Sequence, residues 1–305
     1  MNSFRFRGAP NNTYSIAVPI RADRSGYLGR ECPNPKCLKY FKVTPGTGVK
    51  GSAPCHCPYC GHTGDSNTFG TRQQIEYGAS IAKQQFIQQV HQNIRNTFGR
   101  NRNVTYTPGP PIPIRHYREL DLESEIVCDE CGLRYAIYGE FAWCPDCGVH
   151  NSLQILNKNL ELAKRRLEFA ASADKDLAHT FVADALSGIV ASFDGFGREV
   201  CKNNAKVSFQ NLECGRKAVI REYGFDVAEV VSDDEWTFCS RSFQKRHLLM
   251  HRMGVVDEDY KKHTTDTSAI VGRKIALPSS EVATLIELIE RIGKRLYEGV
   301  MQKKA

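Results

Sequence analysis

The sequence predicts a multidomain protein in which two small zinc-ribbon β modules precede an all-α helical bundle. Two observations carry this prediction. Eight of the 12 cysteines form four close pairs in the first half of the chain, and apolar residues recur at helical steps of three and four from residue 151 onward. A length of 305 residues suits about two domains. We therefore divide the chain into a first ribbon (1–70), a helix with a Pro-rich linker (71–119), a second ribbon (120–150) and a helical domain (151–305).

The composition is typical of a globular protein, with 41% apolar and 25% charged residues. No run approaches the ~18 consecutive apolar residues of a membrane helix. The N-terminal stretch "MNSFRFRGAPNNTYSIAVPIRADRSG" lacks the apolar segment of a secretory signal. Cysteines in such a chain indicate metal ligation rather than disulfides. We expect a cytoplasmic protein without a membrane partner.

The first cysteine block begins at residue 32 and ends at residue 60. Its close pairs give the ligand set Cys32, Cys37, Cys57 and Cys60. Cys55, His56 and His62 lie nearby, and the pattern leaves open whether one of them replaces a cysteine. We select the second pair because its "CPYCG" repeats the form of "CPDCG" later in the chain. The following "CLKYFKV" alternates like a strand.

The second cysteine block has a cleaner pattern, with two C-x2-C pairs separated by twelve residues. The ligand set is Cys128, Cys131, Cys144 and Cys147. Four thiolates can enclose Zn²⁺ tetrahedrally and leave no open position, which is typical of a structural site. Gly132 and Gly148 follow the second cysteine of each pair, where a tight turn favours glycine. The intervening "GLRYAIYGEFAW" predicts a short hairpin. Each block is therefore expected to hold one structural zinc ion.

Positive charge is concentrated in the first third of the chain. Residues 1–100 hold 13 Lys and Arg against 4 Asp and Glu, whereas residues 101–305 hold 28 against 30. Lys and Arg suit phosphate-rich partners, because they release condensed counterions when they neutralise phosphates. Basic and aromatic residues alternate near the first block: Arg21, Arg24, Arg30, Lys36, Lys39, Lys42 and Lys50, with Tyr40, Phe41 and Tyr59. Three roles stay open for the ribbons: nucleic-acid contact, protein contact, or stability alone.

Helices are predicted over 71–99 and, in the second half, over about 151–170, 176–203, 208–222, 237–253 and the segment after 277–281. Between the two cysteine blocks, "TPGPPIPI" at 107–114 predicts an extended linker. The five later helices form a bundle. The remaining cysteines of this half, Cys201, Cys214 and Cys239, are expected in its core.

Residues 246–251 read "RHLLMH" within the fourth of these five helices. On a helix, His247 and His251 share a face, and Arg246 lies beside His247. Positive or protonatable groups gather here, just after the acidic "SDDE" at 232–235: Arg241, Lys245, Arg246, His247, His251 and Arg252. A lone histidine is usually a plain surface residue, but this concentration favours a functional site.

The motif, the following "RMGVVDEDY" and the long closing helix resemble the HEPN domains (higher eukaryotes and prokaryotes nucleotide-binding). In that family an arginine, usually followed by a polar residue, precedes a histidine by four to six positions. Arg246, His247 and His251 fit this pattern, and the resemblance covers roughly residues 150–300. It does not extend to the zinc ribbons.

The resemblance implies a metal-independent endoribonuclease that acts as a homodimer, with toxin or defence roles common in the family. The 2′-OH of RNA is the nucleophile, so no catalytic metal is expected. His251 would act as acid or base, Arg246 would stabilise the transition state, and His247 would position the arginine. The expected products carry a 2′,3′-cyclic phosphate and a 5′-hydroxyl.

Two further interpretations stay open. One is a non-catalytic dimer that binds nucleic acid or nucleotides, since HEPN-like bundles also serve as binding modules. The other is a zinc-ribbon transcription or processing factor with a helical dimerisation domain. If the protein is a ribonuclease, residues 260–263 (Tyr260, Lys261, Lys262 and His263) could line its RNA groove. The alternative is that they form an exposed loop.

Overall fold

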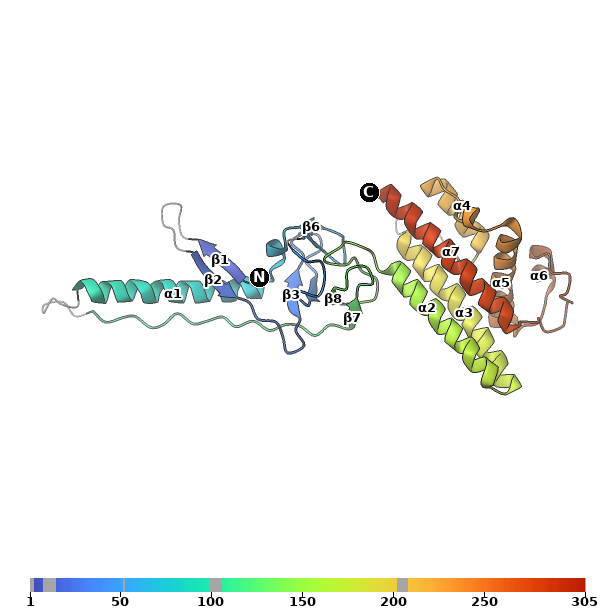
Figure 1. The fold of residues 1–305 in the computed structure, drawn as a ribbon, viewed down its shortest axis with the longest axis horizontal. Coiled ribbons are helices and arrows are strands. Elements are labelled where there is room, and N and C mark those ends of the chain that lie inside the picture. Colours follow the sequence, from blue (N-terminus) through green and yellow to red (C-terminus); the bar gives the residue numbers. More distant parts are fainter. Residues whose placement is uncertain (1–2, 8–14, 52, 99–105, 202–207, 305) are drawn as a thin grey trace. The chain divides into compact units, whose positions relative to one another are not determined.

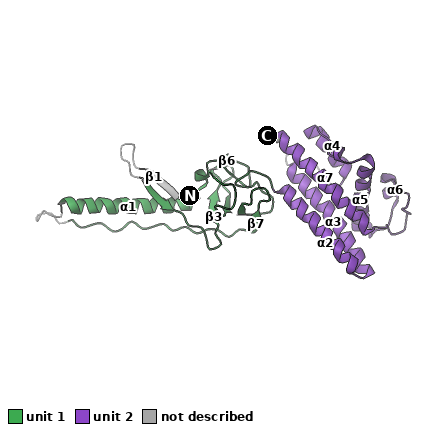
Figure 2. Ribbon diagram, viewed as in Figure 1, with its two compact units in different colours: residues 1–150 green, residues 151–305 purple. Residues whose placement is uncertain are grey.

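The computed structural model describes all residues except 1–2, 8–14, 52, 99–105, 202–207 and 305. The chain forms two compact units, Met1–His150 and Asn151–Ala305 (Figure 2). The first unit holds the two cysteine blocks and small antiparallel sheets, and the second is helical (Figure 1). No helix in the described part of the chain is both long enough and apolar enough to cross a membrane.

The first unit is built on a four-stranded antiparallel sheet with strand order β3–β4–β8–β7. The strands are Leu28–Glu31 (β3), Tyr40–Val43 (β4), Ser124–Val127 (β7) and Arg134–Ile137 (β8). In its centre, Lys42 lies opposite Ala136 and Val43 opposite Tyr135. The two cysteine blocks, which their spacing predicts to be separate modules, therefore share one sheet.

The hairpin expected in "GLRYAIYGEFAW" does not form. Residues 132–143 are all described, and their one strand is β8, which pairs with β7 and β4. Gly139, with φ +86°, turns the chain away after β8. Trp143 then forms a β-bridge with His150 instead of pairing back onto β8.

The other elements of the first unit flank this sheet. They are the hairpins Ser3–Arg7 (β1) with Ser15–Pro19 (β2) and Cys55–His56 (β5) with Thr63–Gly64 (β6), a 3₁₀ turn at Ser66–Phe69, and the helix Arg72–Phe98 (α1). Phe41, Phe69 and Tyr135 are fully buried and pack with several of the cysteines. The cysteine clusters and the apolar core are thus one continuous interior.

The Pro-rich stretch is not a free linker, although it contains neither helix nor strand, as expected. It runs back along α1 (Figure 1). The Arg115 backbone N–H donates to Ser80 Oγ (3.0 Å), and the Arg115 guanidinium pairs with Glu76 (3.0 Å). Proline has no N–H to offer, so this segment is held largely by side chains of the helix.

The second unit has six α-helices among its described residues. They are Ser152–Ser172 (α2), Lys175–Val200 (α3), Leu212–Tyr223 (α4), Asp233–Arg252 (α5), Glu258–His263 (α6) and Ser279–Lys304 (α7), with a 3₁₀ turn at Val227–Val230. α2, α3 and α7 pack together, and α5 packs on α3 and α7 (Figure 1). Fully buried residues such as Leu156, Ile189, Phe193 and Ile292 form the core.

The cysteines of this unit differ from one another in burial. Cys201 and Cys239 are buried in the core, as expected. The same expectation for Cys214 is wrong, because its side chain is exposed. The buried face of the short helix α4 is formed by Leu212, Gly215, Ala218 and Val219. Cys214 lies between the first two of these and faces outward.

Candidate functional site

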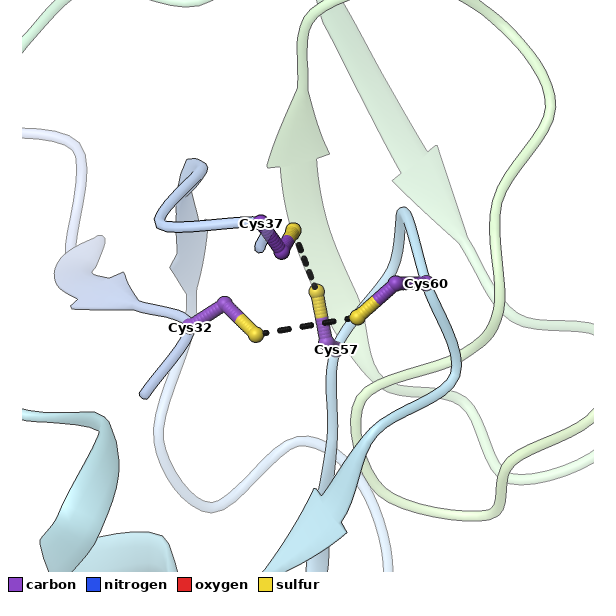
Figure 3. Close-up of side chains that lie close together, drawn as sticks. All are labelled: Cys32, Cys37, Cys57 and Cys60. Atoms are coloured by element: carbon purple, nitrogen blue, oxygen red, sulfur yellow. Dashed lines mark hydrogen bonds between the residues drawn. The ribbon is translucent and has the colours of Figure 1, made fainter. Parts of the chain in front are cut away.

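The first cysteine cluster is assembled by two short turns. Cys32 and Cys37 lie between β3 and β4, and Cys57 and Cys60 lie between β5 and β6. Figure 3 shows their four sulfurs converging on one point. Cys32 Sγ lies 3.7 Å from Cys60 Sγ, and Cys37 Sγ lies 3.8 Å from Cys57 Sγ. These are far longer than the ~2.05 Å of a disulfide.

The second cluster has the same geometry. Cys128 and Cys131 lie between β7 and β8, and Cys144 and Cys147 lie between the bridged residues 143 and 150. The Sγ–Sγ distances are 3.6 Å for both Cys128–Cys147 and Cys131–Cys144. In each cluster all four ligand atoms lie within 4.8 Å of one another. A tetrahedral ion with bonds of ~2.3 Å requires sulfur–sulfur edges of about 3.8 Å, so both clusters suit a four-coordinate metal.

Left-handed backbone positions close the turns. Gly61, Gly132 and Gly148 each follow the second cysteine of a pair and have φ between +69° and +75°. The pair Cys32–Cys37 departs from this rule, because Leu38 takes the same position with φ +49°. A leucine there costs roughly 1–2 kcal/mol relative to right-handed geometry. The turn that follows Cys37 is therefore strained, because a leucine stands where the other three pairs have glycine.

Backbone amides surround several of the sulfurs. Burial acts to raise the pKa of Cys128, but hydrogen bonds from the N–H groups of Cys131 and Glu130 hold it below its ordinary value. Burial dominates at Cys57 and Cys144 and raises the pKa of both thiols. The thiolate is the metal-binding form, so a metal ion must displace protons from these buried groups.

The alternative ligands lie outside the first cluster. Cys55 is buried within β5 and pairs with Gly64 across the small hairpin. The His56 Nδ1 is 2.9 Å from Thr63 Oγ1, and its ring packs against Gly148. His62 lies beside the Phe69 ring. The structure thus brings together the same eight cysteines that the pair spacing selected.

Helix α5 carries the "RHLLMH" motif, and local signals define its ends. Ser232 is the N-cap and forms a capping box with Glu235, so "SDDE" is the start of the helix and does not merely precede it. Met253 ends the helix with φ +53°, and the Gly254 N–H donates to Leu248 O (3.0 Å). The last turn, which holds His251, is therefore fixed in place.

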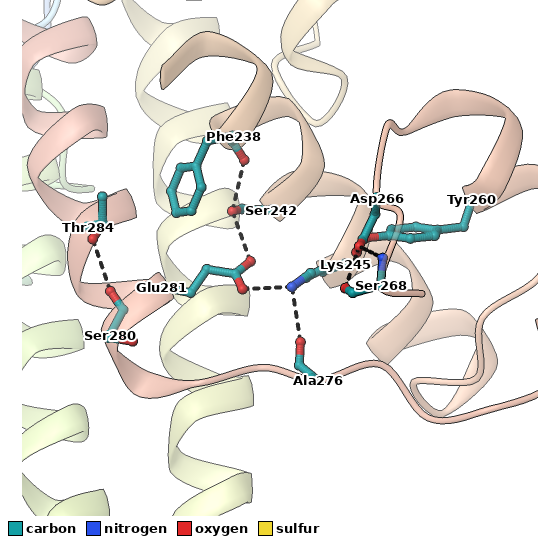
Figure 4. A network of polar contacts seen from close by, with 10 residues as sticks. All are labelled: Phe238, Ser242, Lys245, Tyr260, Asp266, Ser268, Ala276, Ser280, Glu281 and Thr284. Carbon is teal, nitrogen blue, oxygen red and sulfur yellow. Dashed lines mark hydrogen bonds and ion pairs between the residues drawn. The ribbon is translucent and has the colours of Figure 1, made fainter. Parts of the chain in front are cut away.

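A buried polar network joins α5 to the beginning of α7 (Figure 4). Lys245 donates to Glu281 Oε2 (2.6 Å) and to Ala276 O (3.0 Å), and both charged side chains are at most 10% exposed. Ser242 donates to the other oxygen of Glu281. Because this lysine precedes Arg246 and His247 directly, the network fixes how α5 is rotated about its axis.

The two histidines of the motif lie together on the surface. Their ring centroids are 4.6 Å apart and both side chains are exposed. Arg246 is half-buried, and its Nε is buried without a hydrogen-bond partner in the part of the chain that the structure describes. At 100° per helical residue, Arg246 points about 140° away from His251. One chain thus brings the histidines together but does not place Arg246 and His251 on one face.

His247 lines an open cleft of about 510 Å³ between α5, α6 and the residues that precede α4. Polar groups from these three elements reach it, among them Ser208, Gln210, Gln244, His247, Arg252 and His263. Residues 208–210 are held by Asp194 of α3, which is 6% exposed and accepts from Phe209 N (2.6 Å) and Ser208 Oγ (3.2 Å). The buried carboxylate of Asp194 therefore holds residues 208–210, which form the cleft wall opposite α5, in place.

The positively charged side chains expected to form one cluster around the motif have different environments in the structure. Lys245 is buried and paired, Arg241 stacks over the Phe238 ring, and Arg252 pairs with Asp257 (3.4 Å). Asp194 and Glu281, which position the site, were missed by sequence reasoning. Their signal was weak, because a buried acid 30 to 52 residues from the motif looks like any surface acid in the sequence.

Residues 260–263 form the last part of α6 rather than an exposed loop. Tyr260 is buried, and its OH donates to Asp266 Oδ2 (2.8 Å). Lys261 Nζ donates to Asp266 O (2.7 Å). Tyr260 and His263 line the cleft, whereas Lys262 points to solvent. Two of the four residues expected at an RNA groove thus face the same cleft as His247.

No protein-family model, curated protein or solved structure matches the chain.

Proposed function

We propose that this protein is a cytoplasmic, metal-independent endoribonuclease whose reactive groups lie on α5. One observation carries the proposal: the exposed imidazoles of His247 and His251 lie 4.6 Å apart, and His247 lines an open cleft. Arg246, next to His247 in the sequence, has a buried Nε that bonds to none of the described residues. Two imidazoles this close can each offer a ring nitrogen to one phosphodiester. The sequence resemblance to HEPN domains supports the same assignment.

The proposed reaction needs a base, an acid and a positive charge. A histidine takes the proton of the 2′-OH, the 2′-oxygen attacks phosphorus, and the bond from phosphorus to the 5′-oxygen breaks. A histidine returns a proton to the leaving 5′-oxygen, which gives a 2′,3′-cyclic phosphate and a 5′-hydroxyl. The charge that builds up on the phosphoryl oxygens is stabilised by the Arg246 guanidinium. We assign proton transfer to His251, and to His247 the positioning of Arg246 together with contact to the substrate.

A second copy of the chain would complete this arrangement. Arg246 and His251 point away from each other within one chain, so facing motifs would let the arginine of one copy serve the histidine of the other. The surface beside His251 is apolar, since Met250 is 56% and Met253 86% exposed. Burial of such side chains against a second copy would stabilise a homodimer.

We further propose that each cysteine cluster holds a structural Zn²⁺ and that the first unit recognises RNA or a protein partner. The four-thiol donor set and the sulfur–sulfur distances support zinc. Zinc bound in this way contributes to folding and leaves no position for catalysis.

The second candidate is a non-catalytic binder of nucleic acid or nucleotides. The opposed directions of Arg246 and His251 favour it, because a single chain then lacks a complete site. Substitutions separate the two functions. The variants Arg246→Ala and His251→Ala should each cleave RNA about 100-fold more slowly or worse, with zinc content and RNA binding retained. His179→Ala, an exposed histidine on α3, is the matched control. A folded, zinc-loaded wild type that binds RNA and cuts none would favour the binder.

A further inference from the structure

The first unit contains a cleft of about 620 Å³ between the turn after β2 and the segment that returns along α1. Three arginines line it: Arg21 and Arg24 from the turn, and Arg118 from the returning segment. All three are exposed, and their guanidinium groups form no ion pair with any residue that the structure describes. Three unpaired guanidinium groups at one cleft repel one another, and a bound anion would relieve that repulsion.

Three acids line the same cleft, and the charge of one of them, Asp23, is already compensated by Lys42. Asp23 accepts from Lys42 Nζ (2.9 Å) and from the backbone N–H groups of Ser25 and Tyr27. These hydrogen bonds outweigh the opposing effect of burial and hold the pKa of Asp23 below its ordinary value.

Glu119, the second acid, accepts from the Tyr40 hydroxyl and from Gln74 Nε2 (2.9 Å). Asp121 is the one acid of the lining that is exposed without such partners. Both donors to Glu119 are neutral, so Glu119 keeps its negative charge, and the cleft presents the three positive charges of its arginines against the two negative charges of Glu119 and Asp121.

The two walls of the cleft are held together by a tyrosine. The Tyr117 hydroxyl donates to Arg21 O and accepts from Arg21 N, both at 2.9 Å. Tyr117 also packs edge-on against Tyr77 of α1, with ring centroids 5.1 Å apart. The His116 ring lies 6.4 Å from the Tyr77 ring and is exposed. An aromatic group thus flanks the arginines on a braced backbone.

We infer that this cleft binds the sugar-phosphate backbone of single-stranded RNA. Arg21, Arg24 and Arg118 neutralise phosphates, and the neighbouring aromatic side chains stack with bases. Positive charge interleaved with aromatic rings is the pattern of sequence-tolerant single-strand binding, whereas an acidic peptide needs no aromatic surface. The choice of RNA as the polyanion rests on the proposed ribonuclease function.

Several of the basic and aromatic residues that the sequence suggested for nucleic-acid contact are not available in the structure. Lys42 and Phe41 are buried, and the Tyr40 and Tyr59 hydroxyls bond inside the unit. Lys36, Lys39 and Lys50 are exposed near the first cysteine cluster. A zinc ion with four thiolates carries a net charge of about −2, which these lysines offset. They therefore supply a control of equal charge.

The test compares two triple variants in the full-length, zinc-loaded chain with His251→Ala added to prevent cleavage. One carries Arg21→Gln, Arg24→Gln and Arg118→Gln, and the control carries Lys36→Gln, Lys39→Gln and Lys50→Gln. Binding of a labelled mixed-sequence RNA oligonucleotide is measured by anisotropy over a series of salt concentrations. None of the six side chains bonds to the described fold, except that Lys39 lies over the Tyr59 ring. Zinc content and circular dichroism verify folding.

The arginine variant should bind about 100-fold more weakly, and its slope of log K against log salt should be smaller by about 2, because three phosphate contacts are lost. The lysine control should stay within about threefold of its parent. Equal losses in both variants, or an unchanged arginine variant, would overturn the inference, as would equal affinity of the parent for polyglutamate. Because binding is measured without cleavage, a protein that binds RNA here and never cuts it would refute the ribonuclease alone.

Discussion

Replacement of Lys245 by methionine tests whether the buried network holds α5 in place. The change removes the ammonium group, keeps most of the side-chain volume and leaves the Glu281 carboxylate in a site that is 10% exposed. It also removes the hydrogen bonds to Glu281 Oε2 (2.6 Å) and to Ala276 O (3.0 Å). Breaking a buried pair in this way costs about 3–5 kcal/mol, because the remaining charge is uncompensated.

That loss should be visible in urea unfolding. With an m-value of about 2 kcal/mol/M, the midpoint for the second unit should fall by about 2 M. Trp236 of α5 reports on this unit, and Trp143→Phe removes the one other tryptophan of the chain. The double variant Lys245→Met with Glu281→Leu should recover to within about 1 kcal/mol of its parent, since no unpaired charge is left.

Lys164→Met is the matched control, because its partner Glu290 lies 4.0 Å away and both side chains are more than half exposed. Such a surface pair contributes at most about 1 kcal/mol. If Lys245→Met cost no more than Lys164→Met, or if the double variant were as unstable as the single one, the network would not anchor α5.

Three further results are expected. Gly148→Ala should destabilise the first unit by about 1–3 kcal/mol more than Gly139→Ala, as measured by urea unfolding followed by Trp143 fluorescence. Both glycines have positive φ, but a Cβ at 148 would lie 2.9 Å from His56 Cε1, whereas a Cβ at 139 would have no atom within 4 Å. Equal costs for the two variants would contradict the packing around Gly148. A chelator should remove two metal ions per chain faster at mildly acidic than at neutral pH, because protons compete for the thiolates; a pH-independent rate measured by metal release would argue against the clusters as ligands. Burial opposes ionisation of Asp266, but Ser268 and Tyr260 hold its pKa below 3.8, so its contribution to stability is present above pH 3.8 and is lost as pH falls through the lower folded-state value. Asp266→Asn should remove this part of the acid dependence of Trp236-monitored unfolding, and an unchanged profile would count against it.

The sequence predicted the parts of this fold that depend on local patterns. The four cysteine pairs identified both clusters because each pair lies in a single tight turn, and the helices of the second unit followed their apolar periodicity. The pairing of β4 with β8 could not be predicted, since it joins residues more than 90 positions apart whose side chains carry no complementary signal. The exposure of Cys214 was missed for a similar reason, because a four-residue stripe on a short helix does not show which neighbour faces outward.

The motif of the candidate site could be predicted from the sequence, but the residues from other helices that hold the motif and the cleft in place could not. "RHLLMH" marked the histidines, and their adjacency follows from helical spacing alone. Which of the surrounding charges are available depends on Glu281, Phe238 and Asp257. The cleft wall depends on Asp194, which reaches it from α3. The division of the positive cluster into buried, stacked and paired side chains is therefore a property of tertiary packing, and the sequence held no pattern for it.

The central claim is that the 2′-OH of RNA is the nucleophile and that α5 supplies the proton transfers without a catalytic metal. The most direct test incubates zinc-loaded wild type, with free divalent ions chelated and zinc retention verified, with an RNA and with the same sequence fully 2′-O-methylated. Product ends are then mapped. The account predicts cleavage of the unmodified RNA alone, with 2′,3′-cyclic phosphate and 5′-hydroxyl ends, and none by His251→Ala. Cleavage of the methylated strand, or products with 3′-hydroxyl and 5′-phosphate ends, would contradict it.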